Sequence, residues 1–369
     1  MLHSVWLTDW KEAQSTLYRA AARDYEELYR LFMHGAVDEQ LFRKRRAHFG
    51  VGPRPVGGRV LLRLTIPLGR LSPAQLRTAA DLAQRFTPGR QFHLTPRQNL
   101  NFYDVPLEDT PAFLHAATAA GFGPAPAAGD GPCNVVLPAG CGLLPGEAFD
   151  ATFAAALLQQ RLGSDAALRD LPGPFKVGFW RNLYDEESEP GNDLTVVPAR
   201  RRVGTRQVRG FRLMLGGGLG PNPRVEALWK AFVEPELLHA HVRAVALHFK
   251  EGCQDSRPGL RLRDLLLAEG WPAFQEDVAH RVAQEAPDRR ALFFHRLPLG
   301  QAAAVGATLP SWLHGFAVPL PRPGLFLVKG QPWGGMVGAG TAEGLANLVE
   351  RYGQGELRVT ARQQLWIPG

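Results

Sequence analysis

Cysteine is scarce in this chain, which has three among its 369 residues: Cys133, Cys141 and Cys253. An odd and sparse set argues against a disulfide framework. An iron–sulfur cluster usually takes four thiolates, so these three do not make a self-contained cluster site.

Also absent is any run of about 18 apolar residues, so we expect no membrane span. Near the N-terminus, Asp9, Lys11 and Glu12 stand where a secretory signal would need an apolar stretch. The sequence therefore predicts a cytoplasmic protein without a membrane partner.

Acidic residues are fewer than basic ones, 35 against 42, which gives a net charge of +7. The basic residues are dispersed, apart from short clusters at residues 43–46 and 200–202. The simplest interpretation of each cluster is a solvated face, and no nucleic-acid signature accompanies them. The charge leaves an anionic cofactor or an acidic electron-transfer protein as candidate partners.

An internal repeat is the most informative feature that is present. The pattern Thr-x-Arg-Gln-x-Leu stands at residues 95–100 and again at residues 360–365. A predicted strand at residues 61–64 precedes the first copy, and one at residues 325–328 precedes the second. Each copy also has a predicted helix between its strands.

The start and the apolar stripe of each helix are predicted from spacing. Ser72, followed by Pro73 and by Gln75 three residues on, caps the first helix, and Thr341 is the expected cap of the second. Apolar residues at i, i+3, i+4 and i+7 predict one buried face on each helix. These residues are Leu76, Ala79, Ala80 and Ala83 in the first helix, and Leu345, Leu348, Val349 and Tyr352 in the second.

The two copies are predicted to pair, because two strands and one helix leave a sheet face and edges uncovered. The repeat then has two interpretations. It is architecture alone, or Arg97 and Arg362 point from facing strand ends into a shared anion-binding cleft.

A long insert separates the copies, and residues 11–34 precede them as a helical arm. Strands that alternate with helices predict an α/β unit in the insert. The expected elements are a helix at 148–162, strands at 174–180, 194–197 and 210–215, and helices over about 225–283.

Several motifs, in order, resemble the sirohaem-dependent nitrite/sulfite reductase family. Beside the two Thr-x-Arg-Gln copies, the family's Arg-Asn-Val-x is similar to residues 133–136, and its Leu-Pro-x-Lys-Phe-Lys to residues 171–176. Its Gly-Phe-x4-Gly-Gly-Gly-Leu is intact at residues 210–219. The resemblance covers about residue 30 to the end of the chain.

The resemblance implies an α+β fold, in which two half-ferredoxin-like strand-helix-strand modules pair as a pseudo-dimer around an inserted α/β sirohaem-type domain. The expected parts are a helical N-terminal arm at 1–50, the first half at 51–124, the central domain at 125–315 and the second half at 316–369.

The resemblance also implies a site. Sirohaem carries eight carboxylates, so it needs cationic and amide partners. The residues carried over as cofactor-binding are Thr95, Arg97, Asn101, Asn134 and Gln363, and no residue is assigned as a metal ligand. Family members reduce nitrite or sulfite by six electrons, and cationic side chains hold the oxyanion and supply protons.

The cationic positions are where this chain departs from the family. Cys133 and Thr65 replace arginines, and Pro174 replaces a lysine. Lys176 remains, and it is the residue predicted to be catalytic. The family's 4Fe–4S cysteines, Cys-x5-Cys and Cys-x3-Cys, follow the second half, and such pairs are absent up to Gly369.

Three functions stay open. The chain is a reductase component that binds sirohaem, receives electrons from a ferredoxin or flavoprotein and needs a second chain for the cluster. Alternatively, it is a non-catalytic tetrapyrrole-binding or scaffold protein, or a truncated inactive family member. A neighbouring chain with the missing cysteine pairs would favour the first, and sirohaem binding without reductase activity the second.

Overall fold

The chain forms two compact units, Met1–Ala127 with Ala307–Gly369, and Ala128–Gly306. The computed structural model describes residues 2–54, 57–125, 131–184, 187, 190–220, 223–253, 260–288, 291, 311, 314–322 and 324–369. Among them, no helix combines the length and apolar character that a membrane crossing requires.

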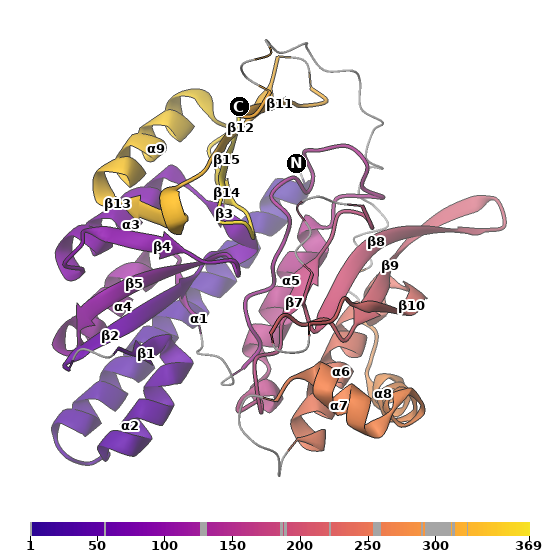
Figure 1. Cartoon of the computed structure of the whole chain (residues 1–369), viewed down its shortest axis with the longest axis horizontal. Coiled ribbons are helices and arrows are strands. Elements are labelled where there is room, and N and C mark those ends of the chain that lie inside the picture. Colours follow the sequence, from indigo (N-terminus) through magenta and orange to yellow (C-terminus); the bar gives the residue numbers. More distant parts are fainter. Residues whose placement is uncertain are drawn as a thin grey trace. The chain divides into compact units, whose positions relative to one another are not determined.

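The first unit contains both halves of the repeat (Figure 1). Its N-terminal part has the helices α1 (Leu2–Met33), α2 (Glu39–Arg46), α3 (Pro73–Phe86) and α4 (Thr110–Ala119). Its strands are β1 (Val51–Pro53), β2 (Arg59–Thr65), β3 (Arg70–Leu71), β4 (Gln91–Leu94), β5 (Asn99–Pro106) and β6 (Gly123–Pro124). The Ser72–Gln75 capping box that opens α3 is confirmed.

The second half follows the same plan. It has β11 (Ala317–Pro319), β12 (Phe326–Gly330), β13 (Met336–Gly338), α9 (Ala339–Tyr352), β14 (Leu357–Val359) and β15 (Leu365–Pro368). The predicted cap of α9 is wrong: the helix starts at Ala339 after Gly338, and Thr341 lies inside its first turn. The small residues at 338–340 allow this earlier start.

The two halves exchange a strand, which confirms the predicted pairing. The first sheet has the order β1-β2-β5-β4-β13, and the second β11-β12-β15-β14-β3. Thus β13 of the second half pairs with β4, and β3 of the first half pairs with β14, both antiparallel. Each half therefore fills the edge that the other leaves open.

Helices α3 and α9 pack on each other, and Arg77 of α3 pairs with Glu350 of α9 at 2.6 Å. The stripe of α3 is buried as predicted. The predicted buried face of α9 is wrong for two of its four residues, because Leu348 is 48% exposed and Tyr352 is 62% exposed. The buried residues of α9 are instead Ala339, Ala342, Ala346 and Val349.

The second unit packs helices with a four-stranded sheet of order β10-β9-β8-β7. Its elements are α5 (Thr152–Ser164), β7 (Val177–Phe179), β8 (Leu194–Val203), β9 (Arg206–Leu215), β10 (Ala227–Val233), α6 (Leu238–Gly252), α7 (Leu262–Glu269) and α8 (Trp271–Gln284). Strands β7 and β8 are parallel, and the other pairs are antiparallel. Strand β10 corrects the expectation of helices from residue 225.

Candidate functional site

Each Thr-x-Arg-Gln copy forms the same tight turn at the end of a strand. In the first turn, the Thr95 hydroxyl accepts a hydrogen bond from Asn99 N at 3.0 Å. In the second, the Thr360 hydroxyl accepts from Gln364 N at 3.0 Å. The glutamines Gln98 and Gln363 have positive φ, 53° and 62°. The repeated sequence thus encodes a repeated backbone conformation.

The two glutamines reach across to the opposite half of the unit. The side-chain amide of Gln98 donates to the Val359 carbonyl at 2.7 Å, and that of Gln363 donates to the Leu94 carbonyl at 2.6 Å. A Cβ at Gly69 or Gly335 would collide with these amides, and both glycines have positive φ. This reciprocal contact sets the two turns at fixed positions.

Two predicted site residues, Asn101 and Gln363, are joined by a chain of polar side chains. The Asn101 amide donates to the Tyr103 hydroxyl at 3.2 Å, which contacts His93 Nδ1 at 3.0 Å. The other ring nitrogen of His93 lies 2.9 Å from the Gln363 amide nitrogen. Arg63 Nε donates to Asn101 Oδ1 at 3.0 Å and extends the chain. Burial lowers the pKa of His93 and favours its neutral form.

The arginines of the two turns differ in exposure. Arg97 is half-buried, whereas Arg362 is exposed. Guanidinium groups and amides are suited to the carboxylates of a tetrapyrrole. The half-buried Arg97 and Arg63, together with Asn101, therefore fit sirohaem by the chemistry of their donors. Tyr103, His93 and Gln98 were missed from the sequence, although the alternation along β4 and β5 could have shown that His93 and Asn101 share a sheet face.

Asn134 and Lys176 belong to the second unit and lie on adjacent segments. Parallel bridges join Pro132 to Phe175 and Val136 to Gly178, on either side of them. Asn134 is buried and Lys176 half-buried. The Lys176 backbone N donates to the carboxylate of fully buried Asp193 at 2.8 Å.

Asp193 is held from the other side by Arg261, whose Nη2 donates to both carboxylate oxygens at 2.8 Å. Burial raises the pKa of Asp193, and the Arg261 charge opposes that shift. This pair fixes the backbone of Lys176, and nothing in the sequence spacing had indicated it.

Thr65 stands where the family resemblance implies an arginine, and its side chain is held by neighbouring groups. The Thr65 hydroxyl donates to the Gly123 carbonyl at 3.0 Å. It also bonds to Tyr18 of α1, whose pKa burial raises to about 12. The threonine is thus part of the packing between α1 and the sheet.

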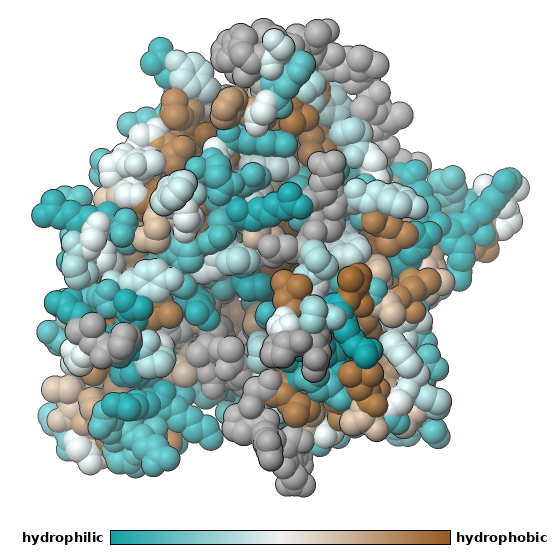
Figure 2. Space-filling view, viewed as in Figure 1, coloured by the Kyte–Doolittle hydropathy of each residue, from teal (hydrophilic) through white to brown (hydrophobic). Residues whose placement is uncertain are grey.

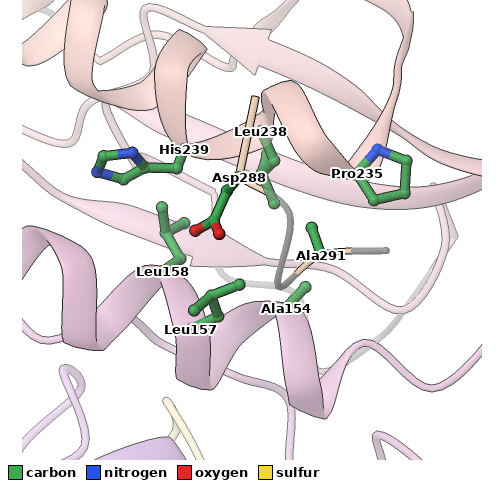
Figure 3. A pocket seen from close by; sticks show the side chains of 8 residues that line it. All are labelled: Ala154, Leu157, Leu158, Pro235, Leu238, His239, Asp288 and Ala291. Carbon is green, nitrogen blue, oxygen red and sulfur yellow. The ribbon is translucent and has the colours of Figure 1, made fainter. Parts of the chain in front are cut away.

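A small pocket in the second unit lies between α5 and the start of α6 (Figure 3). His239 and Asp288 are the polar residues that line it, and the others are apolar. Arg161 pairs with Asp288 at 2.9 Å. None of the predicted site residues lines this pocket, so it is not the candidate site.

All three cysteines lie in the second unit. Cys141 and Cys253 are buried, and burial raises the pKa of Cys253. Across the described ranges, no group of three or more His, Cys, Asp or Glu side chains is placed to hold a metal ion.

The comparisons with known proteins match the architecture. Residues 48–120 and 320–369 match the family "Nitrite/Sulfite reductase ferredoxin-like half domain". Residues 128–286 match the family "Nitrite and sulphite reductase 4Fe-4S domain". Both halves of the repeat and the insert between them therefore match domains of nitrite and sulfite reductases.

Similar whole proteins include the assimilatory ferredoxin-dependent nitrite reductase of Haloferax mediterranei, 27% identical over 82% of this chain and 53% of that protein. The ferredoxin–nitrite reductase of Synechococcus elongatus is 28% identical over 94% of this chain and 66% of that protein. The structure of Mycobacterium tuberculosis NirA is similar with a TM-score of 0.76 and 21% identity, over 94% of this chain and 64% of NirA.

The chain thus spans about half to two thirds of the length of the relatives that it matches. The exchanged strands, the paired Thr-x-Arg-Gln turns and the family matches agree, and the chain belongs to the nitrite/sulfite reductase family.

Proposed function

We propose that this chain binds sirohaem and takes part in the six-electron reduction of nitrite or sulfite, with a ferredoxin or flavoprotein as electron donor. The observation that carries the proposal is the pair of interlocked Thr-x-Arg-Gln turns, the first of which carries the half-buried Arg97, together with the polar chain from Arg63 to Gln363. A second polypeptide would supply the 4Fe–4S cluster, because the three cysteines do not fit one.

In this proposal, the residues of the first unit bind and orient. Arg63 and Arg97 would pair with tetrapyrrole carboxylates, while Asn101 and Gln363 would offer amide groups from positions that are already fixed. Thr95 keeps the turn closed. When bound, sirohaem would supply the iron and the path for electrons.

In the second unit, Lys176 would act on the oxyanion. Its ammonium group offsets negative charge and holds protons that oxygen atoms need as they leave as water. Asp193 and Arg261 position it through its backbone. Asn134, on the neighbouring segment, would be a further polar contact for the cofactor.

The alternative function is a non-catalytic tetrapyrrole-binding protein or scaffold. The observation that favours it is Thr65, at a position where the family resemblance implies an arginine. Its hydroxyl is engaged by Gly123 and Tyr18, so α1 occupies the surroundings of that side chain. Losing one arginine–oxyanion contact costs a few kcal/mol of transition-state stabilisation in a dry site.

The test is to purify the chain from cells that make sirohaem, and then to measure its visible spectrum, bound iron, and nitrite and sulfite reduction with a chemical electron donor. Bound sirohaem with turnover supports the reductase. Bound sirohaem without turnover, even with added cluster-bearing chains, supports the scaffold. An absence of binding would contradict both.

A matched pair of variants locates the cofactor. Arg97→Ala should weaken sirohaem binding at least tenfold, because it removes a half-buried cation from the proposed site. Arg362→Ala, at the equivalent but exposed turn position, should change it less. Equal affinities for Arg97→Ala and the unaltered chain would remove Arg97 from the site.

A further inference from the structure

The hairpin of β8 and β9 carries most of the chain's excess of positive charge. Five of the 42 basic residues and none of the 35 acidic ones lie at residues 200–209, which we call the arginine hairpin. It therefore contributes +5 to a net charge of +7. In Figure 2 the hairpin is a mostly hydrophilic projection. This concentration of charge distinguishes it from the dispersed basic residues elsewhere in the chain.

The arginine hairpin has no third strand beside it. Strands β8 and β9 pair along their whole length. The neighbouring strands stop earlier, because the pairing with β7 reaches only to Val196 of β8 and the pairing with β10 only to Phe211 of β9. The hairpin therefore extends beyond both neighbours (Figure 1). A two-stranded ribbon is marginally stable by itself, so a further strand would stabilise it.

The segment at the end of β10 covers one side of the hairpin. A Cβ at Gly210 would collide with the Phe232 ring and the Val233 carbonyl. The Arg201 guanidinium lies 4.3 Å from the centre of the Phe232 ring, and it pairs with Glu234 at 3.0 Å. Arg201 therefore has an acidic partner within the chain.

The opposite edge, along β8, is open toward the tip of the hairpin. On this edge the Val196 carbonyl accepts a hydrogen bond from Trp180 N. Because the strand has a period of two, Arg200 and Arg202 direct their N–H and C=O groups to the same edge, beyond the part that β7 covers. Pro198, which has no N–H to offer, is typical of an edge position. Within the described residues, no strand pairs with this part of the edge.

The side chains beside this edge are cationic. Arg200 and Arg202 share one face of the hairpin, since side chains two residues apart point the same way. Arg209 stands directly opposite Arg200 on that face. Burial, and after it the charge of Arg200, lower the pKa of Arg209, as like charges on paired strands should. In the described part of the chain, Arg200 and Arg202 have no carboxylate partner, and Arg202 Nε donates to the Gly204 carbonyl at 3.1 Å.

We propose that the free edge of β8 at residues 200–203 binds an extended, acidic segment of a partner protein as an added strand. The backbone of that segment would bond to the N–H and C=O groups of Arg200 and Arg202. Carboxylates on its alternate residues would lie beside the two guanidinium groups, because Cβ atoms of directly opposed residues are about 4.5–5.5 Å apart. This inference is independent of the reaction that the chain carries out.

The chemistry of the edge favours this partner over two others. A second copy of the chain would set arginine against arginine, which like-charge repulsion opposes. Nucleic acid would bring phosphate oxygens, which only accept hydrogen bonds, whereas the edge offers donors and acceptors in alternation as a peptide backbone does. Residues 200–209 also contain no aromatic side chain on which bases could stack.

The test uses the full chain and a peptide of alternating glutamate and threonine, about eight residues long, which is within the usual length of a strand. Hydrogen exchange resolved to residues 200–203 should show the amides of Arg200 and Arg202 open in the free chain and protected by the peptide. Amides that are already protected in the free chain would overturn the proposal, because the chain's own residues would then cover the edge.

A second peptide of the same composition, with its glutamates contiguous, tests the spacing of the charges. It should bind several-fold more weakly, since its carboxylates no longer fall on one face of an added strand. Equal affinities of the two peptides would overturn the added strand.

A matched pair of variants locates the charge. Arg200→Gln combined with Arg202→Gln should weaken binding of the alternating peptide several-fold, because exposed ion pairs each contribute modestly. Lys44→Gln combined with Arg45→Gln removes the same charge from exposed positions of α2 and should leave the affinity nearly unchanged. Equal weakening by the two double variants would mean that only the net charge matters, and would overturn the site.

Two further outcomes would assign the edge differently. Protection of residues 200–203 by DNA and not by the peptide would overturn the proposal in favour of nucleic acid. The arginines would have a purely protective role if the unaltered chain does not bind the peptide while Arg200→Gln with Arg202→Gln causes self-association in light scattering. That result would also overturn the proposal.

Discussion

The two halves of the repeat share a backbone but not an environment. In both halves, the strand that follows the helix ends in a turn that a threonine hydroxyl closes. In both, the glutamine of that turn donates a hydrogen bond to a backbone carbonyl of the other half. Yet Gln98 is fully buried and Gln363 is half-buried. Local hydrogen bonds therefore suffice to repeat the turn, whereas burial depends on which other elements pack around each copy.

The substitutions between the halves follow this difference. His93 of β4 corresponds to Arg358 of β14, and the buried Arg358 pairs with Glu356 at 2.6 Å. The first half thus has a titratable imidazole between Tyr103 and Gln363, where the second has an ion pair. The same position therefore carries a neutral, hydrogen-bonded ring in the first half and a charged pair in the second.

The largest expected effect comes from truncating matched leucines. Leu82→Ala removes a fully buried side chain and should lower the free energy of unfolding by about 2–5 kcal/mol. Leu348→Ala, at the equivalent position of α9, should cost less than about 1 kcal/mol because the side chain is half exposed. Urea unfolding measures both. Similar losses would show that the second half is covered in solution.

A smaller contrast is expected at the two glutamines. Gln98→Asn keeps a residue that tolerates positive φ but withdraws the amide from the Val359 carbonyl, so unfolding should become easier by about 1–3 kcal/mol. Gln363→Asn should cost less, because Gln363 is only half-buried whereas Gln98 is fully buried. Urea unfolding measures the loss of unfolding free energy for both variants. A loss for Gln363→Asn that equals or exceeds that for Gln98→Asn would contradict the difference in burial.

Much of this fold was predictable because its signals are local. The Ser72 capping box, the strands of each half and the repeated turn depend on residues a few positions apart, and the structure confirms them. The start of α9 was not predictable from Thr341, since Gly338 also adopts an extended cap conformation. Strand β10 was missed because residues 227–233 carry no clear alternation.

The site was less predictable because its contacts are long-range. The polar chain from Asn101 to Gln363 joins residues more than 250 positions apart. The alternation along β4 and β5 places His93 and Tyr103 on the face of Asn101, but it does not indicate the contact with Gln363. The anchoring of Lys176 by Asp193 and Arg261 also depends on tertiary packing. Spacing in the sequence identified candidate residues, but not the partners that fix them.

The smallest expected effect is a pH dependence that belongs to the first half alone. Burial lowers the pKa of His93 below its ordinary 6.5, so as the pH falls the unfolded chain takes up a proton before the folded one does. The stability due to neutral His93 is therefore present above pH 6.5 and is lost as the pH falls toward the folded-state pKa. Arg358, its counterpart, stays charged throughout this range.

His93→Gln should flatten the decrease in unfolding free energy between about pH 7.5 and about pH 5.5, measured by urea unfolding at each pH. His239 and His241 of the second unit also have pKa values lowered by burial, so part of the decrease should remain. His241→Gln is the matched control, because it changes the part of the pH dependence that comes from the second unit and leaves the contribution of His93 intact. An unchanged pH profile for His93→Gln would show that the imidazole does not titrate differently in the folded and unfolded chains, and the contrast between the two halves would then be one of packing alone.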